Sequence, residues 1–317
     1  MKLIGISLAV LLAVLVLLIG SLVLYTWTPD IPVEQLKARW APPPSQFIAL
    51  EGMQVHVRDE GPRDDPQPVL LLHGYSDSLY TWDGWVEQLK GRHRVIRLDL
   101  PGFGLTGPAA DGDYRVARYT RLLGKLLDQL GVQHVSVAGN SMGGLLAWHL
   151  ALAEPQRVQR LVLVDAAGYP LEPAKMPLTL RVLTAPALQP LWRKVRSRQL
   201  AEYSVRAVVG DPGQPRPDIV ERLYTLGLRE GNRQARDDVA AQALSDFDDY
   251  PRIAELRVPT LIIWGGRDRL VPPEHALRFK RDIPGSRLAM FSDLGHVPQE
   301  EDPVRSVAVL QNYLDGN

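Results

Sequence analysis

Two kinds of apolar segment divide the chain. Residues 3–25 form one almost unbroken apolar run, whereas the remainder carries short apolar runs near residues 68, 94, 135, 161, 259 and 286. Between these short runs, apolar positions recur at helical spacing near residues 79, 114, 142, 273 and 303. Strands that alternate with helices predict an α/β fold, a mainly parallel sheet covered by helices on both faces. Before them, alternation over residues 47–61 predicts a β-hairpin.

The alternation stops after the apolar run at 161–165. About 85 residues, roughly 170–255, separate it from the next strand, and they hold helical patterns broken by loop signals such as Gly210–Gly213. Such an insertion is too long for a simple crossover. We therefore expect a helical cap over residues 170–255 and a core built from residues 47–169 and 256–317.

One stretch of the predicted cap, Met176–Leu200, combines apolar positions at helical spacing with several arginines. A helix that packs its apolar side on the core and exposes a charged side would have this pattern. A helix that faces anionic lipid would have it too. Both interpretations stay open at this point.

The first apolar run is long enough to cross a membrane. At about 1.5 Å per residue it spans roughly 34 Å, against a hydrocarbon core of about 30 Å. A cleaved signal peptide would have a shorter apolar region and a small-residue cleavage site, which this run lacks. We expect residues 1–27 to form a single transmembrane signal anchor, with Tyr25, Trp27 and Trp40 near the interface.

The residues after the predicted anchor, 28–46, hold five prolines around an amphipathic turn at 33–40. They predict a juxtamembrane linker with a short helix on the membrane surface. The two-residue head before the apolar run is typical of an export signal, so we expect a bacterial inner-membrane protein with a periplasmic catalytic domain. Gly5, Ala9 and Ala13 line one side of the anchor helix, and such small residues favour a homodimer through that helix.

The candidate chemistry begins at Gly139–Gly143, which reads Gly-Asn-Ser-Met-Gly between an apolar run and a helical pattern. A serine hydroxyl becomes a nucleophile when a sharp strand-to-helix turn exposes it beside a base. Glycines on either side leave room for that turn. The pattern predicts a nucleophile elbow at Ser141, with helix N-terminal amides directed at the developing oxyanion.

An acid and a histidine follow the serine in the expected order. Asp268 lies in a glycine-rich turn directly after the apolar run at 258–264, and His296 follows Gly295 after another predicted strand. His296 would accept the proton of Ser141, and Asp268 would orient and stabilise the imidazole. Asp165, at the end of its own predicted strand, is the alternative acid.

A second oxyanion donor is expected after an early strand. The apolar run at 68–72 leads into His73, Gly74 and Tyr75. The Tyr75 amide would join the Met142 amide as the oxyanion pair. We interpret His73 as a structural residue that braces the loop by hydrogen bonds.

Together these motifs resemble the α/β-hydrolase superfamily over roughly residues 47–317. The matching segments are His73-Gly74, Asp99–Gly104, Gly139–Gly143, Asp268 and Gly295-His296. The resemblance implies a serine mechanism that needs no metal or organic cofactor. It leaves the substrate open, because this fold hosts many chemistries. Related epoxide hydrolases and dehalogenases carry an aspartate nucleophile, and Ser141 at this position argues against both.

Two substrate classes remain. The chain resembles single-pass bacterial phospholipases A and lysophospholipases in its predicted anchor and in the segments Thr81–Trp85 and Asp99–Pro108. This resemblance implies a serine carboxylic-ester hydrolase acting on phospholipid, lysophospholipid or other acyl esters. The run Gly139–Gly144 is also shared with carbon–carbon bond hydrolases of ring-cleavage products, although their oxyanion loop tends to be richer in glycine than Tyr75–Ser78. Such a hydrolase, or an esterase of soluble substrates, is the alternative.

Charge and composition limit the classes of binding partner that we expect. The 317 residues carry 36 basic and 36 acidic side chains, so the net charge is zero and no nucleic-acid partner is indicated. The chain has no cysteine, which excludes a lipoprotein anchor and is compatible with an oxidising compartment. We expect the membrane bilayer and a lipid substrate, with fatty acid as product, to be the partners.

Overall fold

The computed structural model describes residues 13–14, 17, 20–21, 27–171, 197–213, 215–244 and 247–316. Its centre is one sheet of eight strands, with the order β1-β2-β4-β3-β5-β6-β7-β8. The strands are β1 (Gln46–Leu50), β2 (Met53–Glu60), β3 (Val69–Leu72), β4 (Val95–Leu98), β5 (Val135–Asn140), β6 (Val158–Val164), β7 (Thr260–Gly265) and β8 (Arg287–Phe291).

The sheet is mainly parallel, as predicted. Strand β2 pairs antiparallel with both β1 and β4, so the expected hairpin forms one edge of the sheet. Every pairing from β4 through β3, β5, β6 and β7 to β8 is parallel. Parallel strands bring their carboxyl ends to the same edge, where loops from distant parts of the sequence meet.

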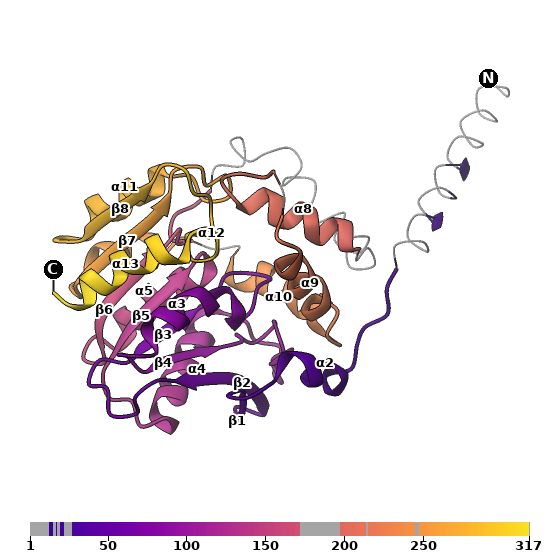
Figure 1. The fold of residues 1–317 in the computed structure, drawn as a ribbon, viewed down its shortest axis with the longest axis horizontal. Coiled ribbons are helices and arrows are strands. Elements are labelled where there is room, and N and C mark those ends of the chain that lie inside the picture. Colours follow the sequence, from indigo (N-terminus) through magenta and orange to yellow (C-terminus); the bar gives the residue numbers. More distant parts are fainter. Residues whose placement is uncertain are drawn as a thin grey trace, which may run out of the picture.

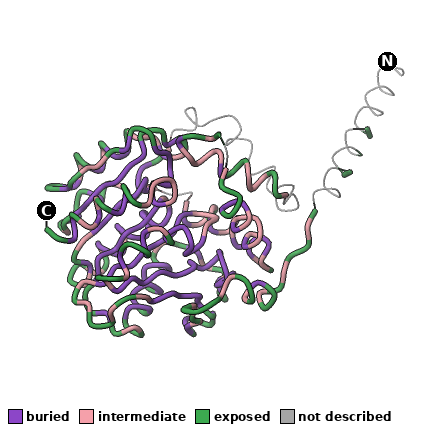
Figure 2. Tube along the Cα trace, viewed as in Figure 1, coloured by how far each residue is buried: buried purple, intermediate pink, exposed green. Residues whose placement is uncertain are grey.

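Successive side chains along a strand point to opposite faces of the sheet and belong to two separate hydrophobic cores. In β3, Val69 and Leu71 belong to one buried cluster, whereas Leu70 and Leu72 belong to the other. The first cluster includes side chains of α3 (Asp83–Leu89) and α13 (Pro303–Leu314); the second includes side chains of α4 (Val116–Gln129), α5 (Met142–Ala153) and α11 (Glu274–Asp282). Figure 1 shows the helices around the sheet, and Figure 2 shows that the buried residues follow its strands. Both faces are therefore covered, which explains the nearly continuous apolar strands.

The predicted cap contains helices. Between β6 and β7 lie α8 (Arg198–Val208), α9 (Pro217–Gly227), α10 (Asn232–Ala243) and the 3-10 helix η4 (Tyr250–Glu255). The α8, α9 and α10 helices gather on one side of the sheet, with α9 beside the N-terminal helix α2 (Val33–Trp40) (Figure 1). Most of the arginine-rich stretch predicted at Met176–Leu200 lies outside the described residues; its last residues begin α8.

The predicted anchor lies almost entirely outside the described residues, of which only 13, 14, 17, 20, 21 and 27 fall within positions 1–27. Among the residues that are described, no helix is long and apolar enough to span a membrane. The anchor, its orientation and the homodimer interface through Gly5, Ala9 and Ala13 thus stay predictions.

The segment predicted as a juxtamembrane linker packs against both core and cap. Leu36 of α2 is buried in a small cluster whose other buried members are Leu79, Tyr80, Leu105 and Leu226. Ile31 accepts a backbone hydrogen bond from Glu230 at 3.0 Å and donates one to Leu228 at 2.7 Å, both of them in the α9–α10 loop. Residues 30–40 therefore form a strap from the core to the cap.

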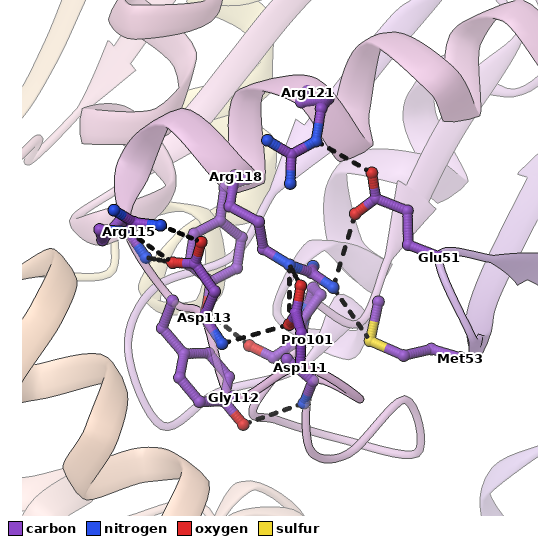
Figure 3. A network of polar contacts seen from close by, with 12 residues as sticks. Glu51, Met53, Pro101, Asp111, Gly112, Asp113, Arg115, Arg118 and Arg121 are labelled. Carbon is purple, nitrogen blue, oxygen red and sulfur yellow. Dashed lines mark hydrogen bonds and ion pairs between the residues drawn. The ribbon is translucent and has the colours of Figure 1, made fainter.

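A polar network fixes the loop between β4 and α4 (Figure 3). The guanidinium of Arg118 is almost fully buried and contacts Asp111 at 3.3 Å and Glu51, in the β1–β2 turn, at 3.5 Å. The Tyr119 hydroxyl donates to the Pro101 carbonyl at 2.6 Å. Because α4 is tied in this way to the hairpin and to both ends of the loop, residues 101–113 are held in a fixed position.

Candidate active site

Ser141 occupies the sharp turn that its flanking glycines predicted. Strand β5 ends at residue 140, α5 begins at residue 142, and Ser141 between them has φ 55° and ψ −117°. This positive φ is uncommon for a residue with a side chain and marks a strained position. A Cβ on Gly139 would lie 2.1 Å from the Gly143 carbonyl oxygen, so no larger residue fits where strand and helix cross.

Asp268 and His296 are brought together at the carboxyl edge of the sheet. Asp268 follows β7, and its Oδ1 accepts hydrogen bonds from the amides of Leu270 at 2.7 Å and Val271 at 3.1 Å. Its Oδ2 lies 2.7 Å from Nδ1 of His296. Because a carboxylate accepts hydrogen bonds, Nδ1 carries the proton and Nε2 is left to act as a base.

The histidine loop is attached to the serine elbow by a residue whose side chain was given no role from sequence. The side-chain amide of Asn140 donates to the His296 carbonyl at 2.9 Å and to the Val164 carbonyl at 3.1 Å. Asn140 directly precedes Ser141, so the first bond fixes the backbone at His296 relative to the elbow and the second fixes the end of β6.

A second such residue attaches the histidine loop to the cap. Glu301 accepts a hydrogen bond from the Gly295 amide at 2.8 Å and another from the Gly210 amide, just after α8, at 2.7 Å. The His296 amide donates to the carbonyl of Val208, at the end of α8, at 2.7 Å. No local pattern signals the two contacts with the cap, because Gly210 and Glu301, like Val208 and His296, are about 90 residues apart in the sequence.

The predicted oxyanion loop lies against the elbow. A Cβ on Gly74 would lie 3.2 Å from the Cβ of Ser141 and 3.1 Å from Oδ1 of Asn140. Tyr75, the predicted donor, follows at once. Met142, the other predicted donor, is the first residue of α5, where helical amides have no intrahelical acceptor. Both predicted donors therefore belong to segments that meet at Ser141.

His73 braces this loop. Its ring is fully buried, Nδ1 donates to the Gly74 carbonyl at 2.7 Å, and Nε2 accepts from the Leu100 amide at 2.9 Å. Burial holds the pKa of His73 below its ordinary value, despite the nearby charge of Asp99. A neutral ring with one donor and one acceptor nitrogen fits both contacts, in agreement with the structural role predicted for it.

Asp165, the alternative acid, also lies at the site, although the described partner of His296 Nδ1 is Asp268. Asp165, Asp268 and His296 each offer a polar atom within 4.8 Å of the others, a spacing that a metal ion would accept. Burial, followed by the charge of Asp268, raises the pKa of Asp165 well above its ordinary value. Two carboxyl groups therefore share this buried region.

An ion-pair cluster joins cap and core beside the oxyanion loop. Arg222 of α9 is buried and donates to Asp77 at 3.1 Å and to Glu300 at 2.5 Å. Burial raises the pKa of Glu300 to about 7 against the opposing charge of Arg222. A pocket opens next to the cluster, lined among others by Ser76, Ser78, Phe103, Leu226, Asn232 and Arg236.

Comparison with known proteins agrees with this architecture. The family model described as "alpha/beta hydrolase fold" matches residues 67–303. A 2-hydroxy-6-oxononadienedioate/2-hydroxy-6-oxononatrienedioate hydrolase of Cupriavidus pinatubonensis is 32% identical over 269 residues, 81% of this chain and 90% of that protein.

Two solved structures are similar in fold. One is a membrane phospholipase A described as a bacterial virulence factor, with a TM-score of 0.73, 24% identity and coverage of 100% of this chain and 99% of that chain. The other is a meta-cleavage product hydrolase of Pseudomonas fluorescens, with a TM-score of 0.72, 25% identity and coverage of 86% and 98%. The chain therefore belongs to the α/β-hydrolase fold family and is a hydrolase.

Proposed function

We propose that the protein is a serine hydrolase that cleaves carboxylic esters through an acyl-enzyme on Ser141. The observation that carries the proposal is the Asp268–His296 pair, joined at 2.7 Å and held beside the strained Ser141 turn. His296 takes the proton of Ser141 as the hydroxyl attacks the ester carbonyl, then returns it to the departing alcohol. The Tyr75 and Met142 amides stabilise the oxyanion, and His296 next activates water to release the acid.

The substrates that we propose are phospholipids or lysophospholipids taken from the bilayer. The apolar run at residues 3–25 supports this choice, because a catalytic domain anchored in the bacterial inner membrane would meet acyl esters at the membrane surface. The likeness to a membrane phospholipase A extends over the whole chain, whereas the meta-cleavage product hydrolase covers 86% of it. We place the catalytic domain in the periplasm, with a homodimer through the anchor.

A second candidate is hydrolysis of a carbon–carbon bond. The 32% identity to the Cupriavidus enzyme favours it, and an acyl-enzyme route needs the same serine, histidine and acid. That enzyme's name describes a dicarboxylate substrate, which needs a cation in the site. Arg222, a guanidinium next to the oxyanion loop, is already bound to Asp77 and Glu300. Arg236, which lines the same pocket as Arg222, contacts Asp237 at 3.5 Å. Because these positive charges are already paired, we favour a neutral ester as the substrate.

The deciding experiment uses full-length protein in detergent and phosphatidylcholine with a different acyl chain at each position. We expect release of one fatty acid, identified by its mass, and loss of at least about a thousandfold in rate, roughly 4 kcal/mol, in Ser141→Ala. Equal release by wild type and Ser141→Ala would refute the mechanism. Turnover of 2-hydroxymuconate semialdehyde without turnover of any ester would establish the second candidate instead.

A further inference from the structure

The carboxyl group of Asp165 is left incompletely bonded in the most buried part of the site. Asp165 directly follows β6, is fully buried and has φ 44°, a left-handed conformation that is costly for a residue with a side chain. Its amide donates to the Ile263 carbonyl at 3.0 Å, and its Oδ1 accepts from the Gly265 amide at 2.9 Å. For Oδ2, no donor lies within hydrogen-bond reach among the described residues.

Another carboxyl group, that of Asp268, lies close to Asp165. One oxygen each of Asp165 and Asp268 and one ring nitrogen of His296 lie within 4.8 Å of one another. The other acidic group that acts on Asp165 is Glu301, whose own pKa is raised by burial. Two buried carboxylates at this separation repel strongly, so such a pair holds a proton.

Hydrogen-bond donors decide which of the two carboxyls keeps its charge. Asp268 accepts three N–H groups, from Leu270, Val271 and His296. Asp165 accepts one, from Gly265. Donors stabilise the ionised form, so the carboxyl with fewer donors, Asp165, keeps the proton of the pair.

We propose that Asp165 is a neutral carboxylic acid that donates its proton in a hydrogen bond to Asp268, and so acts as a positioning residue for the Asp268–His296 pair. The inference rests on the proposed serine mechanism. The hydrogen bond holds the Asp268 carboxylate in the orientation that His296 needs. It also withdraws some of the negative charge that stabilises the His296 imidazolium.

Asp165 is well placed for this role because its segment touches both parts of the machinery. The Ala167 amide donates to the Ser141 carbonyl at 3.0 Å. A Cβ on Gly144, in the first turn of α5, would overlap that of Ala166 at 2.4 Å. A shift of residues 165–167 would therefore move the nucleophile and the acid together.

Asp165→Asn is the diagnostic variant, because its side-chain amide can donate to Asp268 as a neutral carboxylic acid would. The reaction to follow is labelling of Ser141 by a fluorophosphonate, measured as a rate constant against pH on full-length protein in detergent. This readout needs the nucleophile and its base but no knowledge of the natural substrate. Ser141→Ala is the control for the mechanism itself.

We expect Asp165→Asn to label within about threefold of the wild-type rate, with the same pH midpoint. Asp165→Ala should label at least about tenfold more slowly, with a midpoint moved to higher pH, because Asp268 would then stabilise the imidazolium more strongly. The infrared spectrum supplies a second measurement. Because Glu300 and Glu301, whose pKa values are also raised, contribute protonated carboxyl groups of their own, the readout is the wild-type minus Asp165→Asn difference spectrum, which should contain a protonated-carboxyl band at pH 7. If Asp165→Ala fails to fold, Asp165→Asn and this band decide.

The contrary outcomes are distinct. A loss in Asp165→Asn as large as that in Asp165→Ala, or a difference spectrum without a protonated-carboxyl band, would overturn the proposal, since Asp165 would then be charged. Wild-type labelling by Asp165→Ala would overturn it as well, because no positioning role would remain. Labelling of Ser141→Ala at the wild-type rate would instead refute the proposed function.

Discussion

Replacing Gly143 by alanine should disable the serine elbow while leaving most of the fold intact. A Cβ at this position would lie 2.1 Å from the Leu72 carbonyl oxygen and 2.7 Å from that of His73. The first distance is about 1.3 Å short of the 3.4 Å at which ordinary contact begins. Both obstacles are backbone atoms at the end of β3, which pairs with β4 and β5 in the middle of the sheet.

Moving the central strand β3 would disrupt its pairing with β4 and β5, so we expect α5 and the oxyanion loop to move apart instead. Overpacking of this kind costs roughly 1–3 kcal/mol of stability. A misplacement of about 1 Å in a catalytic arrangement costs on the order of a hundredfold in rate, equivalent to about 2.7 kcal/mol. For Gly143→Ala we therefore predict a kcat/KM about a hundredfold below wild type, mainly through kcat, and unfolding free energy lower by no more than about 3 kcal/mol.

The assay is hydrolysis of p-nitrophenyl butyrate together with urea denaturation. Gly91→Ala is the matched control, because a Cβ on that glycine meets no heavy atom within 4 Å. The control should keep wild-type activity. If Gly143→Ala retained more than half of the wild-type kcat/KM, the close approach of α5 to the end of β3 would not govern the geometry of the oxyanion hole.

Two further predictions concern the cap and the strap. Burial raises the pKa of Glu300 to about 7 from an ordinary 4.5, so ionising this carboxyl in the folded protein costs stability as the pH rises between these values. The wild-type melting temperature should therefore fall relative to that of Glu300→Gln between about pH 4.5 and 7. Parallel curves for the two proteins would contradict this cause. Leu36→Ala should lower the free energy of unfolding by about 2–4 kcal/mol in urea, because the Leu36 side chain is 4% exposed. The control Leu277→Ala, at a side chain that is 60% exposed, should stay within about 0.5 kcal/mol; equal losses in the two variants would refute the packing role of the strap.

The elements of the fold could be predicted from sequence because each has a local cause. Apolar runs bounded by turn residues predicted the parallel strands, and the spacing between them predicted a helical cap. The elbow was equally readable, since only glycine at 139 and 143 leaves room for the turn that exposes Ser141. The short helix at Val33–Trp40 was also expected, but its packing against both the core and α9 was not.

The arrangement of the acids illustrates what local patterns leave undecided. Asp165 and Asp268 each end a buried strand, and from sequence alone either one could serve His296. Neighbouring positions of β6 and β7 in the sheet bring both carboxyls to one place, and the turn after β7 then directs the Asp268 carboxylate to His296. Such a choice depends on sheet order and loop geometry, which no short motif encodes.

By itself, then, the sequence determined the α/β fold, the strand-to-helix turn at Ser141 and the serine, acid and histidine order, because periodicity and turn chemistry act over a few neighbouring residues. Only the tertiary structure decided that Asp268 pairs with His296, that Asp165 lies beside them, and that Glu301 and Arg222 join the cap to the catalytic loops. These contacts connect residues far apart in the chain, and their energies depend on burial and on the few donors that each carboxylate finds once the loops have met.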